Sequence, residues 1–357
     1  MAKLGEYVNI KTGKLDANAS SENGKYPFFT CAIEPLKIDT YSYDCECVLV
    51  AGNGDLNVKY YSGRFDAYQR TYIIESCDKS KLYVPYMYYF LDKYVETLRK
   101  LSIGGVIKYI KLGNLTDAEI PIPELSIQKK IVFNLDKVTH TIDTCNAILE
   151  KLDLLVKSRF IEMFNTGEYT TVKLKSVCSK ITDGTHKTPN YLPEGITFIS
   201  AKNIINGELD FSDVKYISET EYNEIQKRCQ TEIHDILLSK SGSLGSPTIL
   251  RTDKPLGLFE SLAIIKYDRR IMLPEFLCEQ LKTDDIQRQF KIGTKGVAIK
   301  HLHLNVIGDI DVVVPPLALQ QQFADFVEQT DKTKQQVKMV LEKAETLKKA
   351  LMQEYFG

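Results

Sequence analysis

Four short segments of this chain are rich in glycine, a residue that allows close binding of a phosphate. They are residues 52–55 and 102–108 in the first half and residues 240–247 and 292–300 in the second half. A glycine lets a backbone N–H approach a phosphate closely, and a neighbouring lysine supplies positive charge. The segments 102–108 and 292–300, which pair glycine with lysine, predict binding of a phosphate-bearing ligand rather than covalent chemistry.

The sequence shows no recognisable catalytic motif. It has no GxxxxGK[ST] phosphate loop, no HExxH helix, no GxSxG turn and no Asn-Pro-Pro-aromatic motif of an adenine methyltransferase. His301 and His303 have no cysteine or carboxylate cluster beside them at metal-ligand spacing. We therefore expect no catalytic residues, metal or cofactor in this chain. The open alternative is a nuclease that uses scattered acidic residues with magnesium.

The glycine-rich segments recur because the chain is a tandem duplication. The matches at one constant offset are Leu149-Glu150-Lys151 with Leu341-Glu342-Lys343, Pro123 with Pro315, and Gln128 with Gln320. Earlier in the chain, Lys3-Leu4 matches Lys173-Leu174 at a smaller offset, so the second copy is longer in its middle. Duplication predicts pseudo-twofold symmetry, which suits a ligand with two sites such as duplex DNA.

Each copy closes with a long amphipathic helix whose apolar residues repeat at spacings of four and three, as in a coiled-coil seam. The residues expected to pair the helices, or to bind a partner, are Ile131, Leu135, Ile142, Leu149 and Leu152 in the first and Phe323, Val327, Val337, Leu341 and Leu347 in the second. Thr330 and Lys334 are polar interruptions that could fix the register. We expect an antiparallel pair. The alternative is two unrelated helices, each packed on its own domain.

The globular parts read as mixed α/β domains. Residues 47–51 and 236–239 are typical of buried strands, and residues 85–91 and 274–281 predict helices that open on proline. The expected segments are a first domain (1–124), a first long helix (125–166), a second domain (167–316) and a second long helix (317–357).

Composition narrows the class of protein. The 357 residues are 43% hydrophobic and 26% charged, as in an ordinary globular protein, and no apolar run is long enough to span a membrane. The eight cysteines, with no CxxC pair, are expected to be reduced and buried, in a cytoplasmic protein. The net charge of −1 argues against a nucleic-acid-binding protein that acts alone, so a DNA role needs local basic loops or a more basic partner.

Several ordered stretches resemble the specificity subunit of type I DNA restriction-modification systems. In the first half they are Tyr26-Pro27-Phe28-Phe29-Thr30, Lys37-Ile38-Asp39-Thr40-Tyr41, Ala51-Gly52-Asn53-Gly54-Asp55 and Phe65-Asp66-Ala67-Tyr68-Gln69-Arg70-Thr71-Tyr72. In the second half they are Asp183-Gly184-Thr185-His186, Phe198-Ile199-Ser200-Ala201-Lys202-Asn203-Ile204 and the run from Asp235 to Gly245. The proline-rich entries to both helices, followed by Gln128 and Gln320, also fit.

The resemblance implies two target-recognition domains joined by two long antiparallel helices, which would read a bipartite, asymmetric target in double-stranded DNA. It also implies two methyltransferase subunits, which bring S-adenosylmethionine and flip an adenine, and restriction subunits that use ATP and magnesium. The chain itself would carry no cofactor.

Candidate DNA-binding residues are the polar side chains in or beside the predicted loops. They are Asn53, Lys59, Tyr60, Arg64, Tyr68, Gln69, Arg70 and Lys108 in the first domain and Thr185, His186, Lys187, Lys202, Asn203, Lys240, Ser241, Ser243, Lys295 and Lys300 in the second. Two alternatives to a specificity subunit remain open besides a nuclease. One is a coiled-coil interaction scaffold that does not read DNA, and the other is a pair of DNA-binding domains that acts without partners.

Overall fold

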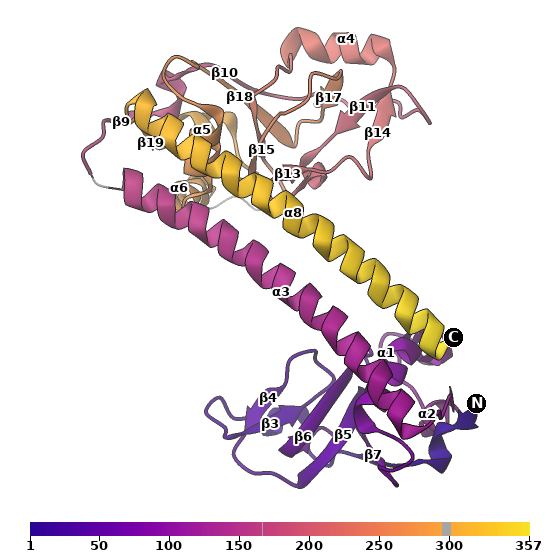
Figure 1. The fold of residues 1–357 in the computed structure, drawn as a ribbon. Helices are drawn as coiled ribbons and strands as arrows, with labels where there is room; N and C mark the ends of the chain where they lie inside the picture. The colour runs from indigo at the N-terminus through magenta and orange to yellow at the C-terminus, as the bar shows by residue number, and fades with distance from the viewer. Residues whose placement is uncertain (166, 295–300) are drawn as a thin grey trace. The chain divides into compact units, whose positions relative to one another are not determined.

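The computed structural model describes residues 1–165, 167–294 and 301–357, and these residues divide into two compact units. The first unit comprises Met1–Asn146 and Lys338–Gly357, and the second comprises Ala147–Val337. Each unit therefore contains a mixed α/β domain together with one half of each long helix. The predicted fold class, two α/β domains joined by two long helices, is confirmed (Figure 1).

The first domain is built on a six-stranded sheet with the strand order β2-β7-β5-β6-β3-β4. Its strands are β2 (Val8–Thr12), β3 (Tyr26–Phe29), β4 (Leu36–Ile38), β5 (Tyr43–Ala51), β6 (Val58–Ala67) and β7 (Thr71–Ser76), and a separate pair is formed by β1 (Ala2–Lys3) and β8 (Glu119–Ile120). Neighbouring strands are antiparallel except β3 and β6, which are parallel.

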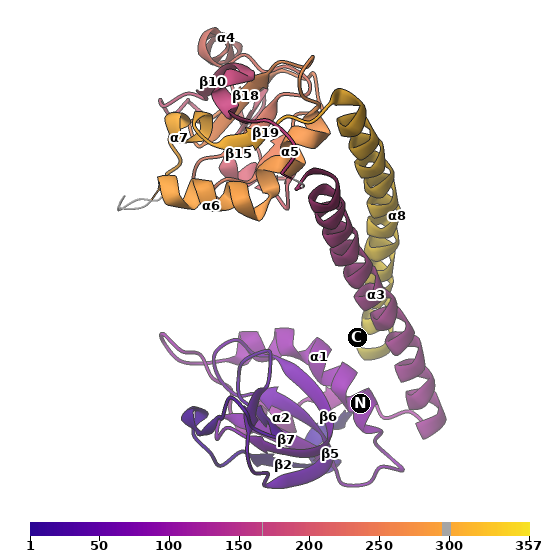
Figure 2. The same ribbon diagram turned by 90° about the vertical axis from the view of Figure 1, so that its left-hand side faces the viewer.

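Helix α1 (Val84–Leu101) lies along this sheet, and α2 (Leu112–Thr116) follows it (Figure 2). The proline at the start of α1 fits the first helical turn, as the sequence predicts, but the helix continues ten residues past the predicted end at Leu91. Its buried face, which includes Tyr86, Met87 and Phe90, forms the main core with Val48, Ile74 and other sheet residues.

The second domain contains a four-stranded sheet with the order β10-β18-β15-β16 and a three-stranded sheet with the order β14-β11-β17. Its strands are β9 (Thr171–Lys173), β10 (Cys178–Asp183), β11 (Ile196–Ile199), β12 (Ile204–Ile205), β13 (Glu208–Leu209), β14 (Lys215–Ile217), β15 (Ile236–Ser239), β16 (Pro247–Ile249), β17 (Leu256–Leu258), β18 (Leu262–Tyr267) and β19 (Asp311–Val313). Its helices are α4 (Glu219–Arg228), α5 (Pro274–Lys282), α6 (Asp284–Gly293) and α7 (Leu304–Gly308). The strand predicted at residues 236–239 and the helix predicted from Pro274 are both confirmed.

The long helices are α3 (Leu125–Phe164) and α8 (Leu317–Phe356), each of 40 residues. At about 1.5 Å per residue, each helix is roughly 60 Å long. The start of α3 shares a unit with the end of α8, and the end of α3 shares a unit with the start of α8, so the two helices run antiparallel as predicted.

Both ends of this helix pair are part of a domain core. In the first unit, Ile131 and Leu135 of α3 pack in one cluster with Met352 and Phe356 of α8. In the second unit, Phe160 and Phe164 of α3 pack edge-to-face on Phe323 of α8, in a cluster that also contains Val327. The alternative of two independent helices, each packed only on its own domain, is therefore wrong.

The expected pairing residues differ in burial along the helices. Ile131, Leu135, Phe323 and Val327 are buried, and Ile142, Leu149, Leu152, Val337 and Leu341 are half-buried. Leu347 is 48% exposed, so its placement in the seam is wrong. Ala344 and Met352 are the buried residues near this end of α8. The four-three repeat continues from Ala344 to Lys348, which is half-buried, so Leu347 lies one position off the seam.

All eight cysteines are free, as predicted. Their predicted burial is confirmed for Cys47, Cys145, Cys229 and Cys278. It is wrong for Cys77, which directly follows β7 and is exposed, and Cys31, Cys45 and Cys178 are only half-buried.

Candidate nucleic-acid interface

One edge of the four-stranded sheet gathers the loops of the second domain. Strand β18 is antiparallel to both β10 and β15, so the ends of β10 and β15 and the start of β18 lie at the same edge. The loops that begin at Gly184 and Lys240 and the turn that ends at Ser261 therefore meet there. In the first domain, the ends of β2 and β5 meet the start of β7 in the same way. We call these two places the loop edges.

The backbone hydrogen bonds at the two loop edges correspond one to one. In the first domain, Gly52 N donates to Arg70 O over 2.8 Å, and Ile110 N donates to Gly52 O over 2.9 Å. In the second domain, Lys240 N donates to Ser261 O over 2.7 Å, and Leu302 N donates to Lys240 O over 2.9 Å. These hydrogen bonds attach the residues that follow segments 102–108 and 292–300 to the loop edges. The duplication is therefore visible in individual hydrogen bonds.

A glycine in the same place supports each loop edge. A Cβ atom on Gly13 would lie 2.1 Å from Ala67 O, and one on Gly184 would lie 2.0 Å from Leu258 O. Real Cβ atoms do not approach backbone so closely, so only glycine fits at these two positions.

The second loop edge holds a buried ion-pair network around Asp183. The Asp183 side chain is 4% exposed and accepts hydrogen bonds from Lys240, which is 3% exposed, and from Arg228 at the end of α4. His186 Nε2 lies 3.3 Å from both Asp183 and Arg228. On the other side, Glu260 lies 3.8 Å from Lys240 and 3.5 Å from His301.

The charges in this network determine its protonation. Burial by itself would raise the pKa of Asp183, but the hydrogen bonds and charges of Lys240 and Arg228 outweigh burial and hold that pKa below its usual range. Burial and the charge of Lys240 lower the pKa of His301, so its imidazole is neutral near pH 7. Asp183 is therefore a negatively charged carboxylate that lies between the cations of Lys240 and Arg228.

Most of the candidate residues of the second domain that the structure describes gather at this edge. Thr185, His186 and Lys187 follow β10, and Lys240, Ser241 and Ser243 follow β15. Ser241, Ser243 and Lys202 also line one hollow of about 570 Å³, although Lys202 pairs with Asp213 at 3.0 Å.

Two kinds of candidate residue in the second domain need separate comment. Asn203 is 4% exposed. Its side chain accepts from Ser200 N and donates to Asp210 O and Asp213 O, so it stabilises the loop instead of contacting DNA. Lys295 and Lys300 lie outside the described residues.

The candidate residues of the first domain fall into two groups. Asn53, Tyr68, Gln69, Arg70 and Lys108 lie at its loop edge, where Gly54 N bonds Lys108 O over 2.9 Å and Asn53 forms a bridge with Tyr109. Arg70 is exposed there.

Lys59, Tyr60 and Arg64 instead lie along β6 and are used within the domain. Lys59 donates to Asn57, and burial lowers the pKa of Lys59. Tyr60 donates to Glu46 over 2.8 Å, and Arg64 pairs with Asp44 at 3.0 Å and lies over the ring of Tyr41.

Sequence reasoning missed two other parts of the site. Arg228 and Asp183 are 45 positions apart in the chain, and no local pattern connects them. Gln128 and Gln320 match in the duplication and in the resemblance, but their role was not predicted: both are fully buried and make equivalent bonds. Gln128 accepts from Tyr83 N and donates to Pro123 O, and Gln320 accepts from Leu273 N and donates to Pro315 O.

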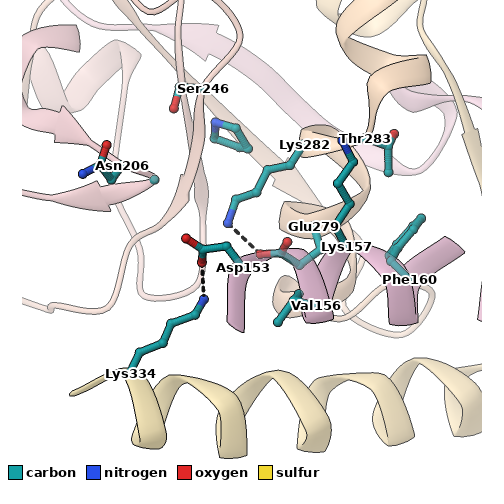
Figure 3. A pocket seen from close by; sticks show the side chains of 12 residues that line it. Asp153, Val156, Lys157, Phe160, Asn206, Ser246, Glu279, Lys282, Thr283 and Lys334 are labelled. Atoms are coloured by element: carbon teal, nitrogen blue, oxygen red, sulfur yellow. Dashed lines mark hydrogen bonds and ion pairs between the residues drawn. The ribbon is translucent and has the colours of Figure 1, made fainter. Parts of the chain in front are cut away.

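A separate pocket of about 310 Å³ lies in the second unit between α3, α5 and the β12–β13 turn (Figure 3). Its lysines are matched by carboxylates: Lys282 pairs with Glu279 at 2.6 Å, and Lys334 of α8 reaches Asp153 of α3 at 2.7 Å. Lys157 pairs with Asp284 at 2.9 Å. This matching leaves little net charge for an anion, and the contact that Lys334 makes is the cross-helix contact expected of a polar interruption.

Within residues 1–165, 167–294 and 301–357, no group of three or more His, Cys, Asp or Glu side chains could hold a metal ion. The rings of His301 and His303 lie 5.7 Å apart at an angle of 67°. No helix among the described residues is long and apolar enough to cross a membrane.

Comparison with known proteins gives consistent results. The model of the family described as "Type I restriction modification DNA specificity domain" matches residues 1–154 and 166–345. The specificity subunit of the type I restriction enzyme EcoDI from Escherichia coli is 37% identical over 155 residues, which cover 43% of this chain but only 34% of that relative. The EcoBI specificity subunit from Escherichia coli is 22% identical over 347 residues, covering 87% of this chain and 73% of the relative.

Among solved structures, this chain is similar to the S subunit of a type I restriction-modification system from M. genitalium, with a TM-score of 0.67 and 18% sequence identity. The match covers 100% of this chain and 95% of that S subunit. That likeness concerns the fold. Because the family model matches both halves of the chain, and each half carries the same loop edge and long helix, the protein belongs to the family of type I restriction-modification DNA specificity proteins.

Proposed function

We propose that this chain is the specificity subunit that directs a type I restriction-modification complex to a bipartite, asymmetric target in double-stranded DNA. Each domain would read one half-site from its loop edge. Side chains there would read base edges, while backbone amides and lysines hold phosphates.

One observation supports the proposal most directly: the two loop edges share a hydrogen-bond frame but carry different side chains. The position of Lys240 in the second domain is taken by Gly52 in the first, and the position of Ser261 is taken by Arg70. A shared frame with different side chains suits the same docking on two different base sequences.

The long helices suit a fixed spacing between the half-sites. Each is a continuous helix that contributes to both domain cores, so its length of roughly 60 Å does not vary as a loop would. A target with a constant number of unread base pairs is expected.

The proposal assigns catalysis to partner subunits. Two methyltransferase subunits would bring S-adenosylmethionine and methylate an adenine N6 in each half-site, and restriction subunits would bring ATP and magnesium. Such partners would also supply basic surface that a chain with a net charge of −1 lacks.

Single-molecule sequencing of N6-methyladenine tests the proposal. A host that expresses this chain with its methyltransferase is compared with the same host lacking only this chain. One gapped motif should disappear when the chain is absent. An unchanged methylome, together with no salt-dependent binding of the purified complex to duplex DNA, would reject the proposal in favour of a scaffold that does not read DNA.

A further inference from the structure

Arg228 is held in place through both its side chain and its backbone. Its Nη2 donates to Asp183, and its backbone oxygen accepts from Lys180 Nζ over 2.6 Å. Arg228 is also the last residue of α4, whose C-terminal turn is closed by a bond from Cys229 N to Ile225 O. The Arg228 side chain is nevertheless 53% exposed, so a fixed donor group faces solvent.

The carboxylate that holds Arg228 is itself anchored. Asp183 is almost fully buried, and Lys240, equally buried, donates to its second oxygen. A buried carboxylate without a cation would be strongly disfavoured, so Lys240 keeps Asp183 ionised and available to Arg228. Lys240 and Asp183 together hold the Arg228 side chain in one position.

The remaining donors of Arg228 are free to bind a ligand. An arginine carries five N–H groups in a planar fork, and Nε and Nη1 of Arg228 have no hydrogen-bond partner in the part of the chain that the structure describes. They lie beside a hollow of about 500 Å³ that is also lined by Thr185, His186 and Lys187.

The acidic residues of this hollow are already engaged. Glu224 pairs with Lys227 at 2.5 Å, and Glu221 accepts from Ser218 and from Asn190 N. They therefore do not compete for the free donors of Arg228, which remain available to an acceptor outside the chain.

We propose that Arg228, positioned by Asp183 and Lys240, reads a guanine in the half-site of the second domain. This inference rests on the proposed function. The free Nε and Nη1 groups offer N–H donors to a base edge that carries only acceptors, and guanine O6 and N7 form such an edge. The adjacent Asp183 carboxylate would repel a charged phosphate more strongly than an uncharged base edge.

The network is confined to one domain, which fits base reading rather than general docking. In the first domain, the position of Lys240 is taken by Gly52, which has no side chain. The position of Asp183, the last residue of β10, is taken by Thr12, the last residue of β2. A contact needed for positioning on any DNA would be expected in both domains.

The test uses the purified complex of this chain with its methyltransferase and a set of duplexes in which each target position is varied. Arg228→Lys keeps the charge but loses the fork, and Arg228→Ala removes both. Either variant should reduce discrimination for guanine at one position of one half-site by about 10- to 100-fold, and should leave the other half-site unchanged. Asp183→Asn should loosen the same position, because the fork is no longer held.

Arg270→Ala is the matched control, since Arg270 is an exposed arginine of the same domain that pairs with Asp268 beyond the opposite end of β18. It should leave base preference unchanged. Thermal melting of each variant shows whether the second domain is still folded.

Two results would overturn the inference. The first is an unaltered preference at every position in folded Arg228 variants. The second is an equal loss on all sequences together with a salt dependence lower by about one ion, which would assign Arg228 to a phosphate. Failure of the proposed function looks different, because the wild-type complex would then show no sequence preference at all.

Discussion

Replacing Gln128 by methionine should destabilise the first domain selectively. The Gln128 side chain is fully buried, accepts from Tyr83 N over 2.9 Å, and donates to Lys81 O over 2.7 Å and to Pro123 O over 2.8 Å. It thereby connects the residue before α1, the entry to α3 and α3 itself. Methionine has nearly the same length but bonds none of these groups.

The magnitude follows from the groups left unpaired. Lys81 is exposed, so its carbonyl can bind water instead, which leaves the N–H of Tyr83 and the carbonyl of Pro123. At about 1–3 kcal/mol for each buried group that loses its partner, the expected loss is about 2–6 kcal/mol. For a domain of this size, that loss lowers the melting temperature by at least about 4 °C.

Differential scanning calorimetry or urea unfolding followed by circular dichroism measures this effect, provided that the transitions of the two domains are resolved. Gln320→Met should lower the other transition by a similar amount, because Gln320 makes the equivalent bonds to Leu273 N, Ile271 O and Pro315 O. Gln336→Met, at an exposed position of α8, is the control and should change stability by less than about 0.5 kcal/mol. A Gln128 variant as stable as this control would refute the reasoning.

Three further predictions concern the loop edges. The folded pKa of Asp183 is depressed, so Asp183 contributes stability that is present above its ordinary pKa of 3.8 and is lost as the pH falls through its folded pKa. Asp183→Asn should therefore lower the free energy of unfolding by about 3–5 kcal/mol near pH 7 and make the acid unfolding of the second domain less steep. An unchanged acid unfolding profile would contradict this prediction. Gly184→Ala should cost more than about 2 kcal/mol because the new Cβ would lie 2.0 Å from Leu258 O, whereas Gly105→Ala, with nothing within 4 Å, should be neutral in a thermal melt. Arg70→Ala should weaken binding of the complex to its target by about 1–3 kcal/mol if Arg70 reads a guanine, and unchanged affinity in a binding titration would reject that role.

The long helices could be predicted from the sequence because their signal is local. Apolar residues at helical spacing mark α3 and α8, and repeated triplets at a constant offset reveal the duplication without any three-dimensional information. The error at Leu347 shows the limit of this signal, since an apolar residue one position off the four-three repeat was assigned to the seam.

The loop-edge residues were harder to predict because exposure and pairing are not visible in a linear pattern. Polar residues in or beside predicted loops include both Arg70, which is exposed, and Asn203, which is buried and holds its own loop together. Arg64 looked equally available, but Asp44 on the neighbouring strand pairs with it.

The sequence alone determined the duplicated architecture, the two helices and the loops that follow β5 and β15, because strand and helix periodicity and turn residues act over a few positions. Only the tertiary structure decided which polar residues act together. Asp183, Arg228 and Lys240 come from the end of a strand, the end of a helix and a loop, and the fold brings them within hydrogen-bond distance. Their pairing depends on burial and on strand order, which are properties of the whole domain rather than of any local segment.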